Sequence, residues 1–385
     1  MVCTRPPPLG ERIGTMRVAL VVPGGVDRTG EYRVIPALLA LLRRLGRVHD
    51  VQVFALRQET KPAEWQLEGV HVHNIGARFT RMRAVGTILA EHRARRFDIV
   101  HSIWSGSCGL IAVTAGSLMR RPSIVHVAGG ELVALPEIGY GGGLTVRGRI
   151  RERLTLRRAT AVTAPSAPIV AAVAQLGVYA HRVPLGVDLE VWPPRRPVPR
   201  QQPQTARLIH VASLNRVKDQ TTLLRALAVL ADSRIEFQMD MVGEDTLGGE
   251  IQALAGALGL SAKVRFHGFR TQRSLRALVE AAHLMIISSR HETGPLVALE
   301  AAVAGVPTVG TAVGHIAEWA PHAAVAVPVG DFNALAQSIA GLLADEQLRL
   351  RIAAEAQGRA LNEDADHTAQ AFEGIYTRLA GAAGG

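Results

Sequence analysis

The chain has 385 residues, of which 48% are hydrophobic and 20% are charged, and its formal net charge is +10 at pH 7. This length exceeds what a single hydrophobic core usually serves, so we expect a globular protein with two domains. No apolar run reaches the roughly 18 residues needed to cross a bilayer, so the sequence predicts no membrane-spanning segment.

The N-terminal residues, the cysteine content and the charge distribution indicate the cellular compartment and the kind of partner. Residues 1–15 lack the continuous apolar stretch of a secretory signal and are expected to form a disordered extension. Cys3 and Cys108 are the only cysteines, which suits a reducing cytoplasm. The first 190 residues carry 25 Lys and Arg against 14 Asp and Glu, whereas the remainder carries 18 against 19. A basic half indicates a polyanionic partner or surface, with a solvated arginine-rich face as the open alternative.

The first half of the chain alternates between strand-like and helix-like segments. MRVALVVPGG (16–25) is an apolar run that ends in glycines, and residues 31–46 follow with apolar positions at helical spacing. Further strand-like segments lie at 51–56, 97–104, 122–129 and 160–166, and helix-like segments lie between them, including 81–96 and 144–158. This rhythm predicts a parallel, doubly wound α/β domain over residues 16–191.

The alternation of strand-like and helix-like segments stops after residue 191 and resumes at residue 207. Residues 192–206 are dense in Pro and Gln and lack periodicity, so they are interpreted as a linker. Strand-like segments then recur at 207–213, 235–243, 263–268, 283–288 and 306–311. We expect a second Rossmann-like domain over 207–361 and a C-terminal helix over 362–385 that can pack back on the first domain. Ligands of such sheets bind at the carboxyl ends of the strands, so both domains are expected to face a shared cleft.

Two glutamates flank a Gly-Pro corner in SSRHETGPLVALEAAVAG (288–305). Glu292 follows a predicted strand, and Glu300 falls early in the next helix, where we expect it to face the cleft. The free amides at that helix start, from Thr293, Gly294 and Leu296, can donate hydrogen bonds to hydroxyls or to an anion. Carboxylates beside them suit recognition of a sugar or ribose. The spacing alone favours the alternative, a capping glutamate and an exposed helical glutamate.

A polar loop follows the first strand of the second domain and contains Ser213, Asn215, Arg216 and Lys218. Cations at the carboxyl end of a strand, beside a helix N-terminus, favour a diphosphate site in which lysine is the point charge. Gly243 ends the next strand and lets the backbone approach a phosphate closely. The alternative for Lys218 is an ordinary surface lysine.

Five segments in sequence order resemble the family-four retaining glycosyltransferases of the GT-B fold. They are VASLNRVKD (211–219), VGED (242–245), KVRFHGFR (263–270), SSRHETGPLVALEAAVAGVPTVGT (288–311) and VPVGDFNALAQSI (327–339). Glu292 and Glu300 match the E-x7-E signature, and the resemblance covers nearly the whole chain after Met16. It implies two Rossmann-like domains that face each other across a cleft, and glycosyl transfer with retention at the anomeric carbon and without a metal.

The resemblance also implies a role for each matching residue. Glu300 is expected to bind the ribose of a nucleotide sugar, and Glu292 to approach hydroxyls of the donor sugar. Lys218 is expected to steady the leaving diphosphate, while Phe269 and Arg270 line the base. Without a metal, Lys218 and the helix amides must neutralise the charge that develops on the departing nucleotide.

The chain departs from the family pattern in its donor loops. Ser213 stands where the family usually has arginine, and Arg216 is the candidate substitute. Pro295 stands where glycine is common, which removes one amide donor.

Two further matches are left open. The cleft histidine of the family aligns near Ala128, so His126, two residues earlier on the same strand face, is the candidate for that catalytic role, with a packed core histidine as the alternative. The glycine of the first loop corresponds either to Gly25, after Gly24, or to Gly30.

Acceptor recognition is expected in the first domain. Residues 128–143 combine glycines with Glu131, Glu137 and Tyr140, and form the candidate acceptor loop, with a mobile surface loop as the alternative.

The next helix is strongly basic. It places Arg147, Arg151 and Arg158 on one side together with Leu154, which suits an anionic membrane or a lipid-pyrophosphate acceptor. Too few aromatic residues accompany the arginines to favour nucleic acid.

The sequence therefore predicts a cytoplasmic GT-B enzyme, with attachment to a membrane surface left open, that moves a sugar from a nucleotide-sugar donor to a glycan, lipid-linked or small-molecule acceptor. No cofactor or metal is expected. One alternative is a catalytically impaired paralogue that binds a nucleotide sugar or a partner protein, which the Ser213 departure favours. Another is a dinucleotide-dependent oxidoreductase, against which no G-x-G-x-x-G follows a strand at the start of either domain.

Overall fold

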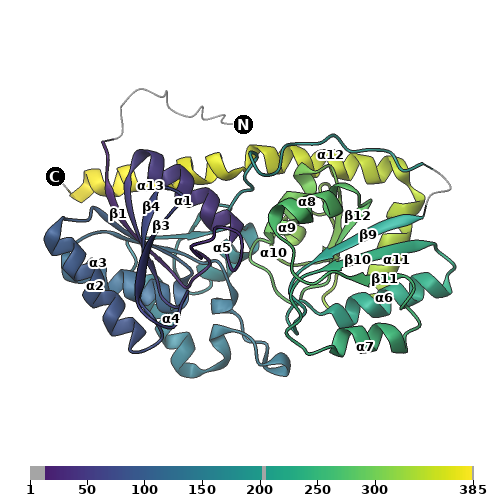
Figure 1. Cartoon of the computed structure of the whole chain (residues 1–385), viewed down its shortest axis with the longest axis horizontal. Coiled ribbons are helices and arrows are strands. Elements are labelled where there is room, and N and C mark those ends of the chain that lie inside the picture. The colour runs from purple at the N-terminus through teal and green to yellow at the C-terminus, as the bar shows by residue number, and fades with distance from the viewer. Residues whose placement is uncertain (1–13, 202–204, 384–385) are drawn as a thin grey trace.

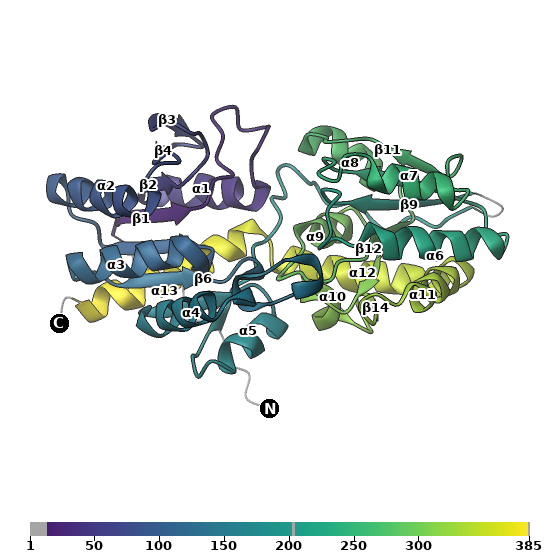
Figure 2. The ribbon, with the colours of Figure 1, turned by 90° about the horizontal axis from the view of Figure 1, so that it is seen from below.

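The computed structural model describes residues 14–201 and 205–383, which form two α/β domains lying side by side (Figures 1 and 2). Each domain is built on one largely parallel sheet with helices on both faces. The predicted fold class, two doubly wound Rossmann-like domains, is confirmed. The expected N-terminal extension up to residue 13 lies outside the described residues, as do residues 202–204 of the expected linker.

The sheet of the N-terminal domain has the strand order β3-β4-β2-β1-β5-β6-β7-β8. Strand β3 runs antiparallel to β4, and the other neighbours pair in parallel. The strands are β1 (Arg17–Val22), β2 (Asp50–Ala55), β3 (Ala63–Leu67), β4 (Val70–Asn74), β5 (Ile99–Ile103), β6 (Ser123–His126), β7 (Ala161–Ala164) and β8 (His181–Arg182). The helices of this domain are α1 (Pro36–Val48), α2 (Thr80–Ala94), α3 (Leu110–Met119), α4 (Val146–Arg158) and α5 (Ala167–Ala174).

The sheet of the C-terminal domain has the order β11-β10-β9-β12-β13-β14 and is parallel throughout. Its strands are β9 (Ala206–Val211), β10 (Phe237–Val242), β11 (Val264–Phe266), β12 (Leu284–Ile287), β13 (Thr308–Thr311) and β14 (Val325–Val327). The helices that follow are α6 (Gln220–Asp232), α7 (Glu250–Ala257), α8 (Gln272–Glu280), α9 (Leu296–Val303), α10 (Gly314–Trp319), α11 (Phe332–Ala344), α12 (Glu346–Asn362) and α13 (Ala365–Ala383).

The sequence did not reveal the hairpin of β3 and β4. Both strands are short, lie at the edge of the sheet and carry Glu, Gln and His on one face, so their apolar content is too low to mark them as strands. The first helix is also shorter than expected. It begins at Pro36, whose fixed φ suits a first helical turn, and residues 31–35 belong to the preceding loop.

Helix α13 leaves the C-terminal domain and packs against α1 of the N-terminal domain (Figure 1). The Phe372 ring is fully buried, with its centroid 4.6 Å from that of His101 and 5.7 Å from that of His126. The Tyr376 hydroxyl lies 2.7 Å from Nδ1 of His101. Two strands of the first domain, β5 and β6, are therefore covered by the last helix of the chain.

Part of the expected linker is fixed to the C-terminal domain. The Trp192 side chain is 2% exposed and belongs to a hydrophobic cluster with residues of α9 and α12. The Arg195 amide donates to the Val303 carbonyl at 3.0 Å. The Pro-rich composition hid this anchoring, because the segment has no periodicity from which burial can be inferred.

The fold predicts a large stability cost for Phe372→Ala. Removing a buried aromatic ring leaves a cavity under β5 and β6, and we expect the free energy of unfolding to fall by about 3–5 kcal/mol in chemical denaturation. Phe269→Ala is the matched control, because that ring is 47% exposed and should cost far less. Equal losses in the two variants would contradict the anchoring role of α13.

Candidate active site

Two strand-to-helix loops of the C-terminal domain bring Lys218 and Glu292 together. The Lys218 ammonium lies 2.5 Å from Oε1 of Glu292, and the Ser289 hydroxyl donates to the same oxygen at 2.6 Å. The Ser288 hydroxyl donates to the Lys218 carbonyl at 2.8 Å, which ties the end of β12 to the loop after β9. A partly exposed cation and a carboxylate thus meet at the carboxyl edge of the sheet.

Helix α6 fixes the position of the Lys218 loop. The Asp219 side chain caps this helix by accepting from the Thr222 amide, and the Asn215 side chain accepts from the Lys218 amide at 3.1 Å. Asn215 therefore stabilises the loop through a hydrogen bond between its side chain and the Lys218 backbone. The Ser213 carbonyl accepts from the Gln220 side chain at 3.1 Å, so this residue also joins the loop to α6.

Glu300 lies inside the protein and not on the cleft wall. It is 2% exposed on α9, and burial raises the pKa of its carboxyl to about 7, while a hydrogen bond from Gln272 opposes this shift. The Gln272 side chain in turn accepts from the Trp192 indole at 2.6 Å. The Gln272 side chain therefore lies between the Glu300 carboxyl and the pocket that Gln272 lines.

Helix α9 begins at Leu296, and Pro295 is its N-cap with an extended backbone. Within the described part of the chain, the amides of Thr293, Gly294 and Leu296 donate no hydrogen bond. A Cβ on Gly294 would lie 2.8 Å from Nε2 of His315, so the close packing there admits only glycine. The three amides remain available as donors beside Glu292.

The candidate acceptor loop touches this donor loop from the N-terminal domain. The Thr293 hydroxyl donates to the Ala128 carbonyl at 2.8 Å, and Nε2 of His291 lies 3.4 Å from the Gly129 carbonyl. Arg290 forms an ion pair with Glu137 at 3.3 Å. The two loops that sequence analysis assigned to donor and acceptor therefore face each other directly.

Tyr140 lies within electrostatic reach of the Glu292 carboxylate. Burial raises the pKa of the Tyr140 hydroxyl, and the negative charges of Glu292 and Glu131 add to this shift. Its ring centroid is 6.3 Å from that of His291. The phenol is thus placed where the two domains meet.

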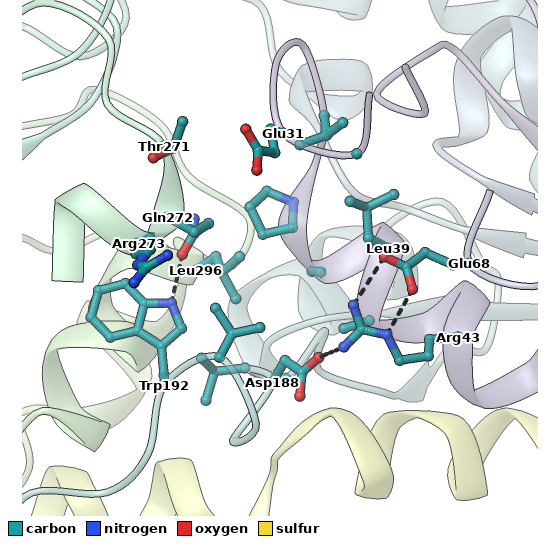
Figure 3. A pocket seen from close by; sticks show the side chains of 18 of the residues that line it. Glu31, Leu39, Arg43, Glu68, Asp188, Trp192, Thr271, Gln272, Arg273 and Leu296 are labelled. Carbon is teal, nitrogen blue, oxygen red and sulfur yellow. Dashed lines mark hydrogen bonds and ion pairs between the residues drawn. The ribbon is translucent and has the colours of Figure 1, made fainter. Parts of the chain in front are cut away.

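A pocket of about 470 Å³ opens between the two domains, and residues 186–188, Val191 and Trp192 form part of its lining (Figure 3). Glu31 and Tyr32 line it from the N-terminal domain, and Gln272 and Leu296 line it from the C-terminal domain. Gln272 and Leu296 connect it to Glu300 and to the start of α9, whereas Lys218 and Glu292 do not line it. The pocket therefore adjoins the Lys218 and Glu292 pair through α9.

Phe269 and Arg270 lie in the loop after β11, near the opening of the cleft. Phe269 is 47% exposed, and its ring centroid is 5.7 Å from that of Tyr32 in the other domain. Arg270 donates to the Phe269 carbonyl at 3.1 Å. Gly243 has a φ of +152° and its amide donates to the Gly268 carbonyl, which joins the ends of β10 and β11.

One predicted site residue lies away from the cleft surface. His126 is fully buried, with Nδ1 2.9 Å from the Thr163 hydroxyl, and burial lowers the pKa of its ring to about 3. The Phe372 ring of α13 packs against it. His126 is thus a core histidine, because α13 occupies its strand face.

Arg216 lies at the surface of the Lys218 loop. It is paired with Glu250 on α7 at 3.0 Å, and it lines a small pocket together with Asn215 and Arg290.

Two further predicted residues hold loops in place. The two Glu131 oxygens accept from the amides of Ser105 at 3.1 Å and Gly129 at 2.7 Å, and burial raises the pKa of this carboxyl to about 7. Gly25 has a φ of +79° and its amide donates to the Gln58 side chain at 2.7 Å. Of the two alternatives for the first loop, Gly30 lines the pocket.

Sequence reasoning missed several residues at the junction. Arg290 and His291 lie inside the quoted signature segment but carry no periodic signal, and Gln272 and Trp192 are far apart in sequence. Arg290 also pairs with Asp219 at 3.1 Å, so it brings a further cation to the Lys218 loop. Its position inside the matched signature segment is the one sequence signal that pointed to it.

Comparisons with known proteins agree with this architecture. The family model "Glycosyl transferase 4-like domain" matches residues 29–186, and "Glycosyl transferases group 1" matches residues 195–359. A D-inositol 3-phosphate glycosyltransferase from Corynebacterium jeikeium is 32% identical over 178 residues, which cover 44% of this chain and 42% of that protein. D-inositol 3-phosphate glycosyltransferase 1 from Catenulispora acidiphila is 27% identical over 338 residues, covering 79% and 80%. The aligned segment thus spans less than half of the first relative.

A solved structure shows the same fold. Anabaena Alr3699/HepE in complex with UDP-glucose superposes with a TM-score of 0.73 at 22% identity, over 94% of this chain and 100% of that chain. Each of the two family models matches one of the two domains described above. On these grounds, the chain belongs to the family-four glycosyltransferases of the GT-B fold.

Proposed function

We propose that this protein transfers a sugar from a nucleotide-sugar donor to an acceptor held by the N-terminal domain. The observation that carries the proposal is the junction of the two domains, where Lys218, Glu292 and the free amides before α9 face the loop at residues 128–143. A cation and helix amides suit a departing diphosphate. The buried carboxyl of Glu300, beside a pocket with room for a nucleoside, suits a ribose.

The proposed reaction proceeds with retention at the anomeric carbon and without a metal ion. Lys218 would neutralise charge on the leaving nucleotide, and Glu292 would orient hydroxyls of the donor sugar. Support for metal independence comes from the Lys218 ammonium, which already supplies the positive charge that a metal would bring.

The nature of the donor base and of the acceptor is part of the proposal. The Anabaena structure contains UDP-glucose, and the two curated relatives are named for D-inositol 3-phosphate. We propose a uridine donor as the first candidate and a glycan, a lipid-linked or a small hydroxylated acceptor near Glu137 and Tyr140.

We also propose that helix α4 rests on an anionic membrane surface in the cytoplasm. Leu118, Ile150 and Leu154 are 61%, 55% and 49% exposed, and they border a groove together with Arg147, Arg151 and Arg158. Apolar side chains between arginines suit the interface of an acidic bilayer. Among the described residues, no helix has the length and apolar content that a membrane span requires.

The first test is calorimetric titration of the protein with UDP, GDP and ADP. We expect one nucleotide to bind. Glu300→Gln should lower the affinity for this nucleotide, because the neutral amide is a poorer acceptor for ribose hydroxyls. The ionised fraction of a carboxyl with a pKa of about 7 rises roughly tenfold between pH 6 and pH 8, so the wild-type affinity should rise with pH.

Glu300→Gln is also the control for this pH dependence, because the nucleotide phosphates titrate in the same range in both proteins. Only the difference between the two pH profiles reports on Glu300. If no nucleotide binds, the impaired-paralogue alternative gains support. A pH profile shared by the two proteins would contradict the role of this carboxylate.

Lys218→Ala is expected to slow transfer more than it weakens nucleotide binding. Loss of one donor to a developing anion costs roughly 10²–10³-fold in rate. The readout is the rate of nucleotide release from the donor sugar that binds, with Lys218→Arg as the variant that keeps the positive charge. Unchanged turnover in Lys218→Ala would overturn the diphosphate assignment.

The membrane proposal is tested by sedimentation with lipid vesicles. We expect binding to vesicles that contain phosphatidylglycerol and little binding to pure phosphatidylcholine. The double variant Ile150→Asp with Leu154→Asp should bind at least about tenfold more weakly, since two apolar anchors are lost. Val329→Asp, at an exposed position of the other domain, is the matched control. Equal binding by both variants would remove α4 from the interface.

A further inference from the structure

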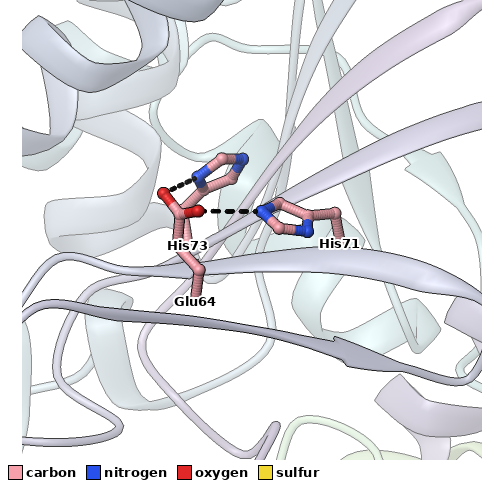
Figure 4. A group of neighbouring side chains, drawn as sticks. All are labelled: Glu64, His71 and His73. Atoms are coloured by element: carbon pink, nitrogen blue, oxygen red, sulfur yellow. Dashed lines mark hydrogen bonds and ion pairs between the residues drawn. The ribbon is translucent and has the colours of Figure 1, made fainter.

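A cluster of three metal-ligating side chains lies on the β3–β4 hairpin of the N-terminal domain (Figure 4). Glu64 on β3 is paired in register with His73 on β4, and His71 lies two residues earlier on the same face of β4. Within the described part of the chain, these three residues offer donor atoms that all lie within 4.8 Å of one another. We propose that Glu64, His71 and His73 bind a divalent transition-metal ion, with zinc as the best match.

The donor atoms lie close enough for one ion to reach all three side chains. Oε1 of Glu64 lies 3.1 Å from Nδ1 of His73, and Oε2 lies 3.3 Å from Nε2 of His71. Two ligands of a tetrahedral zinc with bonds of about 2.0 Å are ~3.3 Å apart. Two imidazoles and one carboxylate form a borderline donor set that zinc accepts readily, and water completes the fourth position.

The side chains around His73 place its Nε2 against the Gln52 oxygen and its Nδ1 against the Glu64 carboxylate. The Gln52 amide donates to Asp50 at 2.7 Å, so its oxygen faces Nε2 of His73 at 3.1 Å. An amide oxygen only accepts, so Nε2 of His73 carries the hydrogen, and Nδ1 of the neutral ring presents a lone pair to the Glu64 carboxylate. Two acceptors at this distance need a cation between them, and either a proton or a metal ion supplies it.

Packing holds the ligands ready for such a cation. The His73 ring stacks on Phe54 with centroids 4.9 Å apart and an angle of 9° between the planes. Its side chain is 7% exposed, whereas His71 is 28% and Glu64 is 62% exposed, so an ion can enter from the solvent side.

A metal ion bound at this site would connect the edge strand β3 to its neighbour β4. Strand β3 ends the sheet, and next to His73 the Asn74 side chain accepts from the amides of Gln58 and Glu59. A metal that bridges β3 and β4 would stabilise the hairpin that supports this loop. The proposal concerns stability alone and stands independently of the transfer reaction.

The test is zinc titration of the full chain, free of affinity tags and previously stripped with a chelator, in competition with a chromophoric chelator. We expect one zinc ion per chain. Glu64→Gln and His71→Gln should each lower the affinity for zinc by at least about 100-fold. Gln52→Leu, which removes the partner of His73, should lower it by about 10- to 100-fold. His322→Gln, which removes an exposed histidine elsewhere, should leave the affinity unchanged.

Thermal unfolding gives a second readout that does not depend on the chelator. Zinc should raise the Tm of the wild type and of His322→Gln in a concentration-dependent way, but not that of His71→Gln. Both tested ligands are at least partly exposed, so their replacement is compatible with folding. If wild type and His71→Gln bind zinc with equal affinity, or if zinc shifts the Tm of both equally, the proposal is overturned.

Discussion

The return of helix α13 to the N-terminal domain is the constraint on which the arrangement of this protein depends. The first sheet is incomplete without it, because Phe372 and Tyr376 supply the apolar and hydroxyl groups that cover β5 and β6. Arg44 of α1 strengthens this docking, since its guanidinium is paired with Asp188 at 3.1 Å and with Asp366 of α13. The chain passes between the domains twice, near residue 188 and near residue 364, and the two passages are joined by the hydrogen bond from Ala365 to Val187.

This double connection limits how far the two domains can move, and so it sets the geometry of the cleft. Around the candidate site, further contacts between the domains are polar: Thr293 with Ala128, His291 with Gly129, and Arg290 with Glu137. The Ser166 hydroxyl also donates to the Thr293 carbonyl, and α5 packs against α10. Exposed ion pairs and single hydrogen bonds contribute little net free energy, so the double connection of the chain is the stronger restraint on the two domains.

The polar groups at the cleft and directly behind its wall fall into two environments with different consequences. Lys218 and Glu292 are partly exposed and neutralise each other, so a ligand that brings negative charge competes with Glu292 for the ammonium. Glu300 instead lies in an apolar helix, where desolvation raises the pKa of its carboxyl to about 7. In the proposed function, hydrogen bonds from ribose hydroxyls would favour its ionised form, and ligand binding would then be coupled to deprotonation of Glu300.

The sequence by itself determined the two-domain α/β plan and much of the donor side of the cleft, because strand periodicity, glycine loops and the Glu292 and Glu300 spacing are local signals. It placed Lys218 and Glu292 in loops at the carboxyl ends of strands, where the structure pairs them. Only the tertiary structure decided which side chains reach the cleft. His126 and His101 were packed under α13, Arg216 was drawn to Glu250, and Gln272 was brought to Trp192 across 80 residues. The edge hairpin and its histidines also emerged only in three dimensions, because burial and cross-strand contact arise from packing between segments that are distant in the chain.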